Sequence, residues 1–169
     1  MIRQRIDRYI EESLQYFAGW LIDSDWVGKE RDCINRFATG FLQPGIAPHA
    51  AISDYGQVRI ENAVPQIAPS NRNAVTKDLV IWKSSEEVTW DSEWNAVNLP
   101  RAIMEWKLRR TVSDKWPYDA YDTSWLKRFT KKYPTVFGYA VTVDINKIGR
   151  AVYYQQMRSG TAKTPWHLY

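Results

Sequence analysis

Residues 102–109 read Ala-Ile-Met-Glu-Trp-Lys-Leu-Arg, and this stretch decides the predicted fold. Side chains alternate along a β-strand, so the stretch has one charged face and one apolar face. The charged face carries Glu105, Lys107 and Arg109, and the apolar face carries Met104, Trp106 and Leu108. A strand inside a mixed sheet seldom carries Glu and Lys two residues apart unless they meet each other, a metal or a substrate.

A second short strand is expected over 78–82, where Asp78 opens the apolar run Leu-Val-Ile-Trp. If this strand pairs with 102–109, Asp78 lies beside Glu105. The polar insertion 83–98, which is rich in Ser, Glu and Trp, must then loop out. Paired strands would therefore bring two carboxylates and a lysine together.

The remaining elements follow from hydrophobic periodicity and turn residues. Apolar residues at three- and four-residue steps predict an amphipathic helix over 2–22 and a second helix over 29–42. A strand is expected from Tyr55 towards Pro65, and 113–122 has a turn-like composition. Beyond it we expect a helix over 123–133, strands over 136–145 and 151–157, and an irregular tail after Ser159.

The predicted fold class is α/β, with a central mixed β-sheet flanked by helices. The chain has 169 residues, of which 44% are hydrophobic, and this size and composition suit a single domain. We expect an N-terminal helical extension over 1–28, a core over 29–158 and a tail over 159–169. No internal repeat or linker divides the chain.

Composition and charge limit where the protein acts. The only cysteine, Cys33, cannot form an internal disulfide, which favours a reducing compartment, and we expect a soluble, cytoplasmic protein. The charged N-terminal stretch predicts no signal peptide, and no apolar run is long enough to span a membrane. A formal charge of +4 permits a polyanionic partner without requiring one.

The grouping of Asp78, Glu105 and Lys107 suits phosphodiester hydrolysis. That reaction needs hard oxygen ligands for Mg²⁺, a source of hydroxide near neutral pH and positive charge against the developing phosphorane. Asp and Glu can hold the metal, and Lys can orient or deprotonate the water. Two close carboxylates repel each other, so we expect Lys107 to neutralise them partly when no metal is bound.

The segments Lys77-Asp78-Leu79-Val80-Ile81 and Ile103-Met104-Glu105-Trp106-Lys107 resemble the PD-(D/E)XK nuclease superfamily. The order of elements is similar too: a helix, strands bearing Asp and Glu-x-Lys, then a helix and a strand. Lys77 stands where the family name expects Pro. The resemblance covers roughly 29–157 and implies a restriction-endonuclease-like core preceded by the extra helix.

The resemblance also implies a function, a Mg²⁺-dependent DNA nuclease in which Mn²⁺ can replace Mg²⁺. By position, Asp78 and Glu105 are the implied metal ligands and Lys107 assists the attacking water. Glu30 is the best match for the supporting Glu of the family's first core helix. The choice of DNA over RNA rests on the family alone.

Simpler interpretations compete with each of these roles. Glu105 and Lys107 could form an exposed ion pair, Asp78 could cap a turn, and Glu30 could favour the helix dipole. Four basic residues are candidate nucleic-acid contacts: Arg109, Arg110, Lys127 and Lys131. Salt bridging for the arginines and a solvated helix face for the lysines are the alternatives.

Two other classes of function remain open. One is an inactive nuclease-fold module that binds nucleic acid or a protein partner. The other is a structural subunit whose tryptophans anchor an interface. The chain could also form a homodimer through the helix over 2–22. His49 and His167 lack metal-ligand spacing and receive no catalytic role.

Overall fold

The computed structural model describes residues 5–45, 50–112, 120–146, 148–163 and 166–169. Its helical elements are α1 (Ile6–Asp23), α2 (Glu30–Gly40), the 3-10 turn η1 (Tyr55–Gln57) and α3 (Ala120–Lys132). Its strands are β1 (Val58–Pro65), β2 (Ala74–Ile81), β3 (Ala102–Arg109), β4 (Phe137–Asp144), β5 (Ala151–Arg158), β6 (Thr161–Ala162) and β7 (His167–Leu168).

The strands form one mixed sheet in the order β1-β2-β3-β4-β5-β6, and β7 also pairs with β5. The neighbours β1–β2 and β2–β3 are antiparallel, β3–β4 are parallel, and β4–β5 are antiparallel. The parallel pair requires a crossover connection, and α3 lies within it. The predicted α/β class with a mixed sheet flanked by helices is therefore confirmed.

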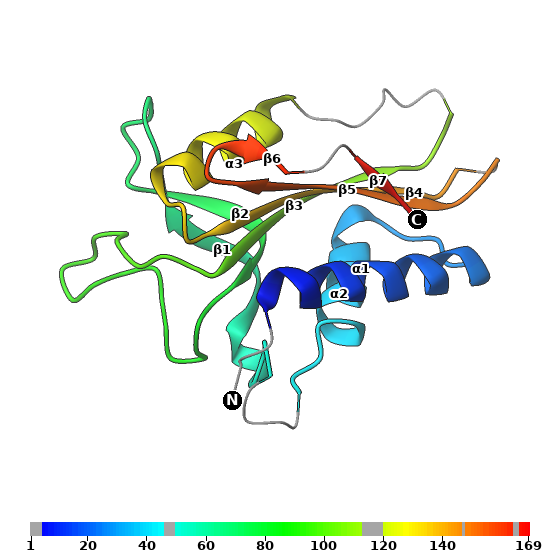
Figure 1. Ribbon diagram of the computed structural model, residues 1–169, viewed down its shortest axis with the longest axis horizontal. Helices are drawn as coiled ribbons and strands as arrows, with labels where there is room; N and C mark the ends of the chain where they lie inside the picture. The colour runs from blue at the N-terminus through cyan, green and yellow to red at the C-terminus, as the bar shows by residue number, and fades with distance from the viewer. Residues whose placement is uncertain (1–4, 46–49, 113–119, 147, 164–165) are drawn as a thin grey trace.

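Helices cover both faces of the sheet (Figure 1): α1 and α2 lie on one side and α3 lies on the other. The apolar residues of α1 recur at helical spacing and are buried against the sheet, as the sequence predicts. Trp106 of β3 is 1% exposed, and its ring centroid lies 5.9 Å from that of Phe17 and 5.0 Å from that of Phe37. The apolar face of β3 thus anchors α1 and α2.

Several predicted boundaries are wrong or incomplete. β2 begins at Ala74, because 74–77 continue the antiparallel pairing with β1, and Tyr55–Gln57 form a 3-10 turn capped by Asp54. The tail contains β6 and β7, which extend the sheet beyond β5. The insertion 83–98 loops out as expected, whereas 113–119 of the predicted turn and 2–4 of the first helix lie outside the described residues.

Side chains along β1 and β2 point alternately to the two faces of the sheet, and this alternation reverses at one position. Leu79 of β2 packs on the α1/α2 side, but Val75, an even number of residues away, packs on the α3 side. Glu61 of β1, which faces the reversal, has a left-handed backbone with φ of 49°. Alternation alone would place Lys77 with Leu79, so the reversal is what brings Lys77 to the α3 side.

Candidate active site

Asp78 lies where β2 and β3 separate. The last paired residues of the ladder between these strands are Leu79 and Met104, and Asp78 is the residue next to Leu79 just beyond the ladder. The backbone N–H of Trp106 donates a hydrogen bond to Oδ2 of Asp78, with an N···O distance of 2.7 Å. Asp78 is therefore fixed beside Glu105, as the sequence predicts, and one of its oxygens closes the gap between the strands.

Glu105 is buried on the α3 side of β3, and its side chain is 7% exposed. Its carboxylate forms an ion pair with the ammonium group of Lys77. Burial is the main cause that raises the pKa of Glu105, Lys77 opposes it, Asp78 adds to the rise, and the resulting pKa is about 7. The carboxyl group therefore changes its charge near neutral pH.

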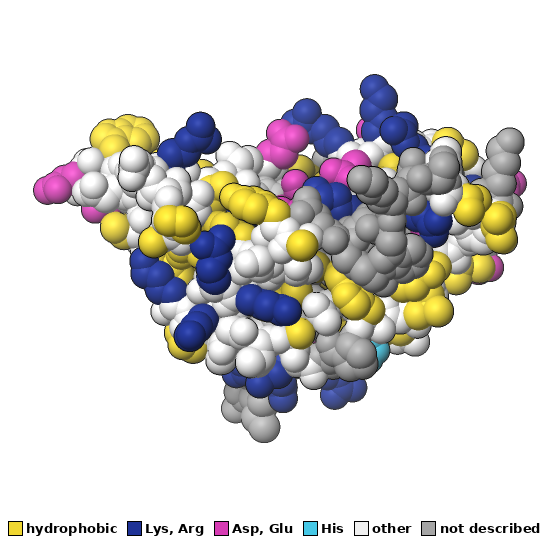
Figure 2. All heavy atoms as spheres, turned by 90° about the horizontal axis from the view of Figure 1, so that it is seen from above, with side chains coloured by type: hydrophobic (Ala, Val, Ile, Leu, Met, Phe, Trp, Pro, Cys, Tyr) yellow, Lys and Arg dark blue, Asp and Glu magenta, His cyan; other side chains and the backbone are white. Residues whose placement is uncertain are grey.

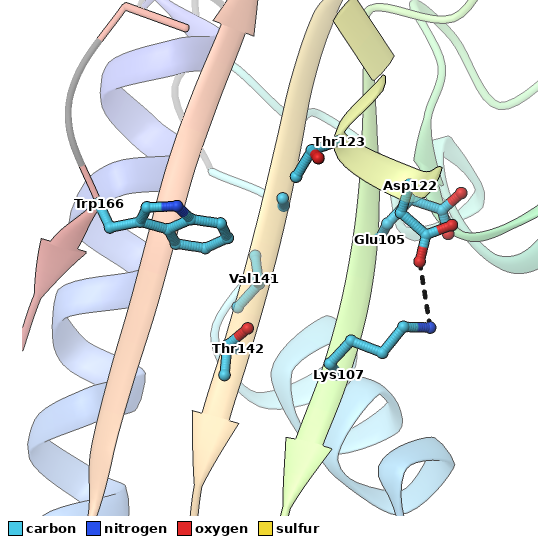
Figure 3. Close-up of a pocket in the computed structure, with 8 residues that line it drawn as sticks. Glu105, Lys107, Asp122, Thr123, Val141, Thr142 and Trp166 are labelled. Carbon is cyan, nitrogen blue, oxygen red and sulfur yellow. Dashed lines mark ion pairs between the residues drawn. The ribbon is translucent and has the colours of Figure 1, made fainter. Parts of the chain in front are cut away.

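Lys107 extends from the same face of β3 but meets a different acid. Its Nζ lies 3.1 Å from Oδ2 of Asp122, in the first turn of α3 (Figure 3). Burial lowers the pKa of Lys107, but Asp122 outweighs burial, and Glu30 and Asp78 add to the upward shift. Lys107 is therefore charged at neutral pH, which suits orienting a water or a phosphate better than accepting a proton.

A small cavity lies beside these groups. Its lining includes Glu105, Lys107, Asp122 and Thr142, and its volume is about 10 Å³. That is close to the space that one water molecule requires. Ala140 and Thr142 of β4 lie next to Glu105 and Lys107 in the register, and their small side chains leave this space open.

Glu30 approaches the site from the opposite helical layer. Its Oε2 accepts a hydrogen bond from the backbone N–H of Leu108 at 3.0 Å, which ties the start of α2 to β3. Burial raises the pKa of Glu30, the hydrogen bond from Leu108 and the charge of Lys107 lower it, and Asp78 and Asp122 raise it. Glu30 is thus coupled electrostatically to the site, while its hydrogen bond also serves the fold.

The two arginines that follow the Glu-x-Lys stretch differ. Nη1 of Arg109 lies 2.9 Å from Oδ2 of Asp144, its neighbour in the β3–β4 register, and this buried pair supports a structural role. Arg110 is exposed and lines a groove of about 300 Å³ together with Lys29 and Glu30. Of the two, Arg110 is better placed to meet a ligand.

Lys127 and Lys131 are exposed on the outer face of α3. Figure 2, which views the molecule from this side, shows Lys and Arg side chains spread over the surface. From residue 123 to the end of the chain, Asp144 is the only acidic residue among eight Lys and Arg. The part of the chain that begins with α3 is consequently rich in positive charge.

Two members of this cluster, Lys77 and Asp122, were not predicted from the sequence. Lys77 pairs with Glu105 in place of Lys107, so the expected neutralisation of the carboxylates by Lys107 is corrected: Lys107 pairs with Asp122. Asp122 fell at the end of a stretch with turn-like composition. The available signal was its place three residues before the buried Trp125, which puts both in the first turns of α3.

The donor set of this cluster is compatible with a small, hard cation. Asp78 and Glu105 offer carboxylate oxygens from adjacent strands, which is the ligand type that Mg²⁺ prefers. Within the described part of the chain, no group of three His, Cys, Asp or Glu side chains is arranged to hold a metal. Asp78 and Glu105 are the candidate side-chain ligands, and the backbone, water or substrate would complete the coordination.

Comparisons with known proteins add no identification. No protein-family model matches the chain, and no curated protein matches it. Among the residues that the structure describes, no helix combines the length and the apolar composition needed to cross a membrane.

Proposed function

We propose that this chain is a metal-dependent nuclease that hydrolyses phosphodiester bonds of DNA. The observation that carries the proposal is the placement of Asp78 beside Glu105 at the end of the β2–β3 ladder, with Lys107 on the same strand as Glu105. A helix, three antiparallel strands, a crossover helix and a parallel strand surround this site in order. That arrangement supports a restriction-endonuclease-like core.

In the proposed site, Asp78 and Glu105 would hold Mg²⁺, with Mn²⁺ as a substitute. A bound Mg²⁺ would lower the pKa of a water molecule and neutralise charge on the phosphate. Charged Lys107 would orient the attacking water or a phosphate oxygen, and Asp122 would hold Lys107 in position. The water oxygen would bond to phosphorus while one P–O ester bond breaks.

Glu30 and the basic residues would have supporting roles. Glu30 would fix the end of β3 through Leu108 and add negative charge near Lys107. Arg110, Lys127 and Lys131 would contact phosphates on either side of the bond that is cut. Arg109 would act on the site through the fold, because Asp144 already engages it.

We place this activity in the cytoplasm. The chain's single cysteine, Cys33, is buried and unpaired, and burial raises the pKa of its thiol to about 12. An inert thiol of this kind serves core packing, and it needs no oxidising compartment.

A second candidate is a nuclease-fold module without turnover that binds nucleic acid or a protein. The observation that favours it is the ion pair between Lys77 and Glu105, because this pair occupies one of the two candidate metal ligands. In that case the basic surface would still bind a polyanion, and substitution of Asp78 would leave this binding unchanged.

Cleavage assays separate the two candidates. Supercoiled plasmid, linear duplex, single-stranded DNA and RNA would be incubated with Mg²⁺ or Mn²⁺ and with wild type, Asp78→Ala or Lys107→Ala. The proposal predicts metal-dependent cutting of DNA that both substitutions abolish. Absence of cutting on every substrate, with DNA binding unchanged by either substitution, would favour the module without turnover.

A further inference from the structure

Lys77 is an unusual residue for its position. Its side chain is 4% exposed, and the reversal of alternation at Asp78 brings it to the α3 side of the sheet. There its Nζ pairs with Glu105 and lies 3.8 Å from the ring centroid of Trp125. A buried lysine needs such partners, because desolvation of an ammonium group is strongly unfavourable.

The ring of Trp125 offers the Lys77 ammonium group a second interaction, a cation–π contact. The indole is itself held in position, since its Nε1 donates a hydrogen bond to Oε1 of Gln66 at 2.8 Å. A cation over an aromatic face is attracted by the ring quadrupole even when the carboxylate partner is lost. The flexible stem of Lys77 therefore lets Nζ leave Glu105 while remaining against the ring.

We propose that the ammonium group of Lys77 stays paired with Glu105 until a divalent metal ion binds Glu105 and displaces it. This inference rests on the proposed function, because it assigns Mg²⁺ to Asp78 and Glu105. An ammonium and a divalent ion on the same buried carboxylate repel each other. Metal binding and the Lys77–Glu105 ion pair are therefore mutually exclusive, and Lys77 sets the metal concentration at which the site loads.

The first test measures Mg²⁺ affinity by calorimetry, without substrate, at a pH above the pKa of Glu105. Lys77→Met removes the competing charge and keeps the apolar stem. Removal of one charge this close to a divalent ion is expected to tighten binding on the order of tenfold. Lys132→Met replaces an exposed lysine on the helix that carries Trp125, and as the matched control it should leave the affinity unchanged.

The outcomes separate this inference from the proposed function. Tighter binding by Lys77→Met, or binding by this variant alone, supports displacement. Equal or weaker binding by Lys77→Met, with clear binding by wild type, overturns the inference and leaves the metal site intact. Absence of binding in every protein overturns both.

A second measurement follows Lys77 in the wild-type protein, and its deciding comparison does not depend on the folding of a variant. The ε-CH₂ resonances of Lys77 should be shifted by the ring current of Trp125, given the 3.8 Å separation of Nζ from the ring centroid. Saturation of the wild-type protein with Mg²⁺ should change these resonances. Unchanged Lys77 resonances, while the amides of Asp78 and Glu105 respond to Mg²⁺, would overturn displacement.

Discussion

The two faces of β3 use the same backbone for opposite purposes. On the α1/α2 side, Met104 and Trp106 pack against aromatic rings and are almost completely buried. On the α3 side, Glu105 is also buried, but it meets an ammonium group and a second carboxylate. Burial therefore stabilises the fold on one face, whereas on the other it holds charges that an apolar pair of similar shape could replace without loss of stability.

The largest effect is expected from breaking the apolar face. Trp106→Ala removes a ring that contacts Phe17 and Phe37 and leaves a cavity that the sheet cannot close. We expect the free energy of unfolding to fall by about 3 to 5 kcal/mol. Urea denaturation measures this change, and a loss below 1 kcal/mol would show that α1 and α2 do not depend on Trp106.

On the charged face, the loss of stability should depend on whether one or both partners of the ion pair are replaced. Lys77→Met leaves Glu105 buried without its cation, and removal of one partner from such a pair destabilises by about 3 kcal/mol. The double variant Lys77→Met/Glu105→Gln removes both charges and should recover most of that loss. Urea denaturation without divalent ions gives both values, and equal losses in the single and double variants would contradict the importance of the pairing.

Stability should also depend on the titration of Glu105. Its pKa is about 7 in the folded chain, compared with an ordinary value of 4.5, so between these pH values the unfolded chain releases the proton first. The free energy of unfolding should therefore fall as pH rises through this window, by up to about 3 kcal/mol. Urea denaturation over a pH series should show that Glu105→Gln removes this decline. A decline of the same size in the variant would assign it to another group.

The smallest effect is expected on the outer face of α3. Lys127→Gln with Lys131→Gln should weaken DNA binding a few-fold, because phosphate contacts are lost. Each lost contact should also reduce the slope of log affinity against log salt concentration by about one unit. Fluorescence anisotropy over a salt series measures both quantities. An unchanged slope would mean that these lysines form a solvated surface without contact to DNA.

The difference between the faces also explains what sequence analysis could predict. Pairing of the strands that carry Asp78 and Glu105 follows from two short apolar runs, so the centre of the candidate site was predictable. The position of Lys77 was not, because alternation places it with Leu79, and nothing in the sequence pattern marks the reversal that coincides with the left-handed backbone of Glu61. Asp122 was missed because α3 starts three residues earlier than its apolar pattern.

The central claim is that the charged face of β3 hydrolyses phosphodiester bonds with the help of Glu105. The most direct measurement is the initial rate of plasmid cleavage in Mg²⁺ for Glu105→Gln and for its matched control, Glu61→Gln. Glu61 is half exposed on β1 and pairs with Arg31 at 2.5 Å, outside the site. We predict that Glu105→Gln lowers the rate by about a thousandfold, as loss of a transition-state interaction does, while the control remains active. Equal rates for the two variants and wild type would contradict the claim.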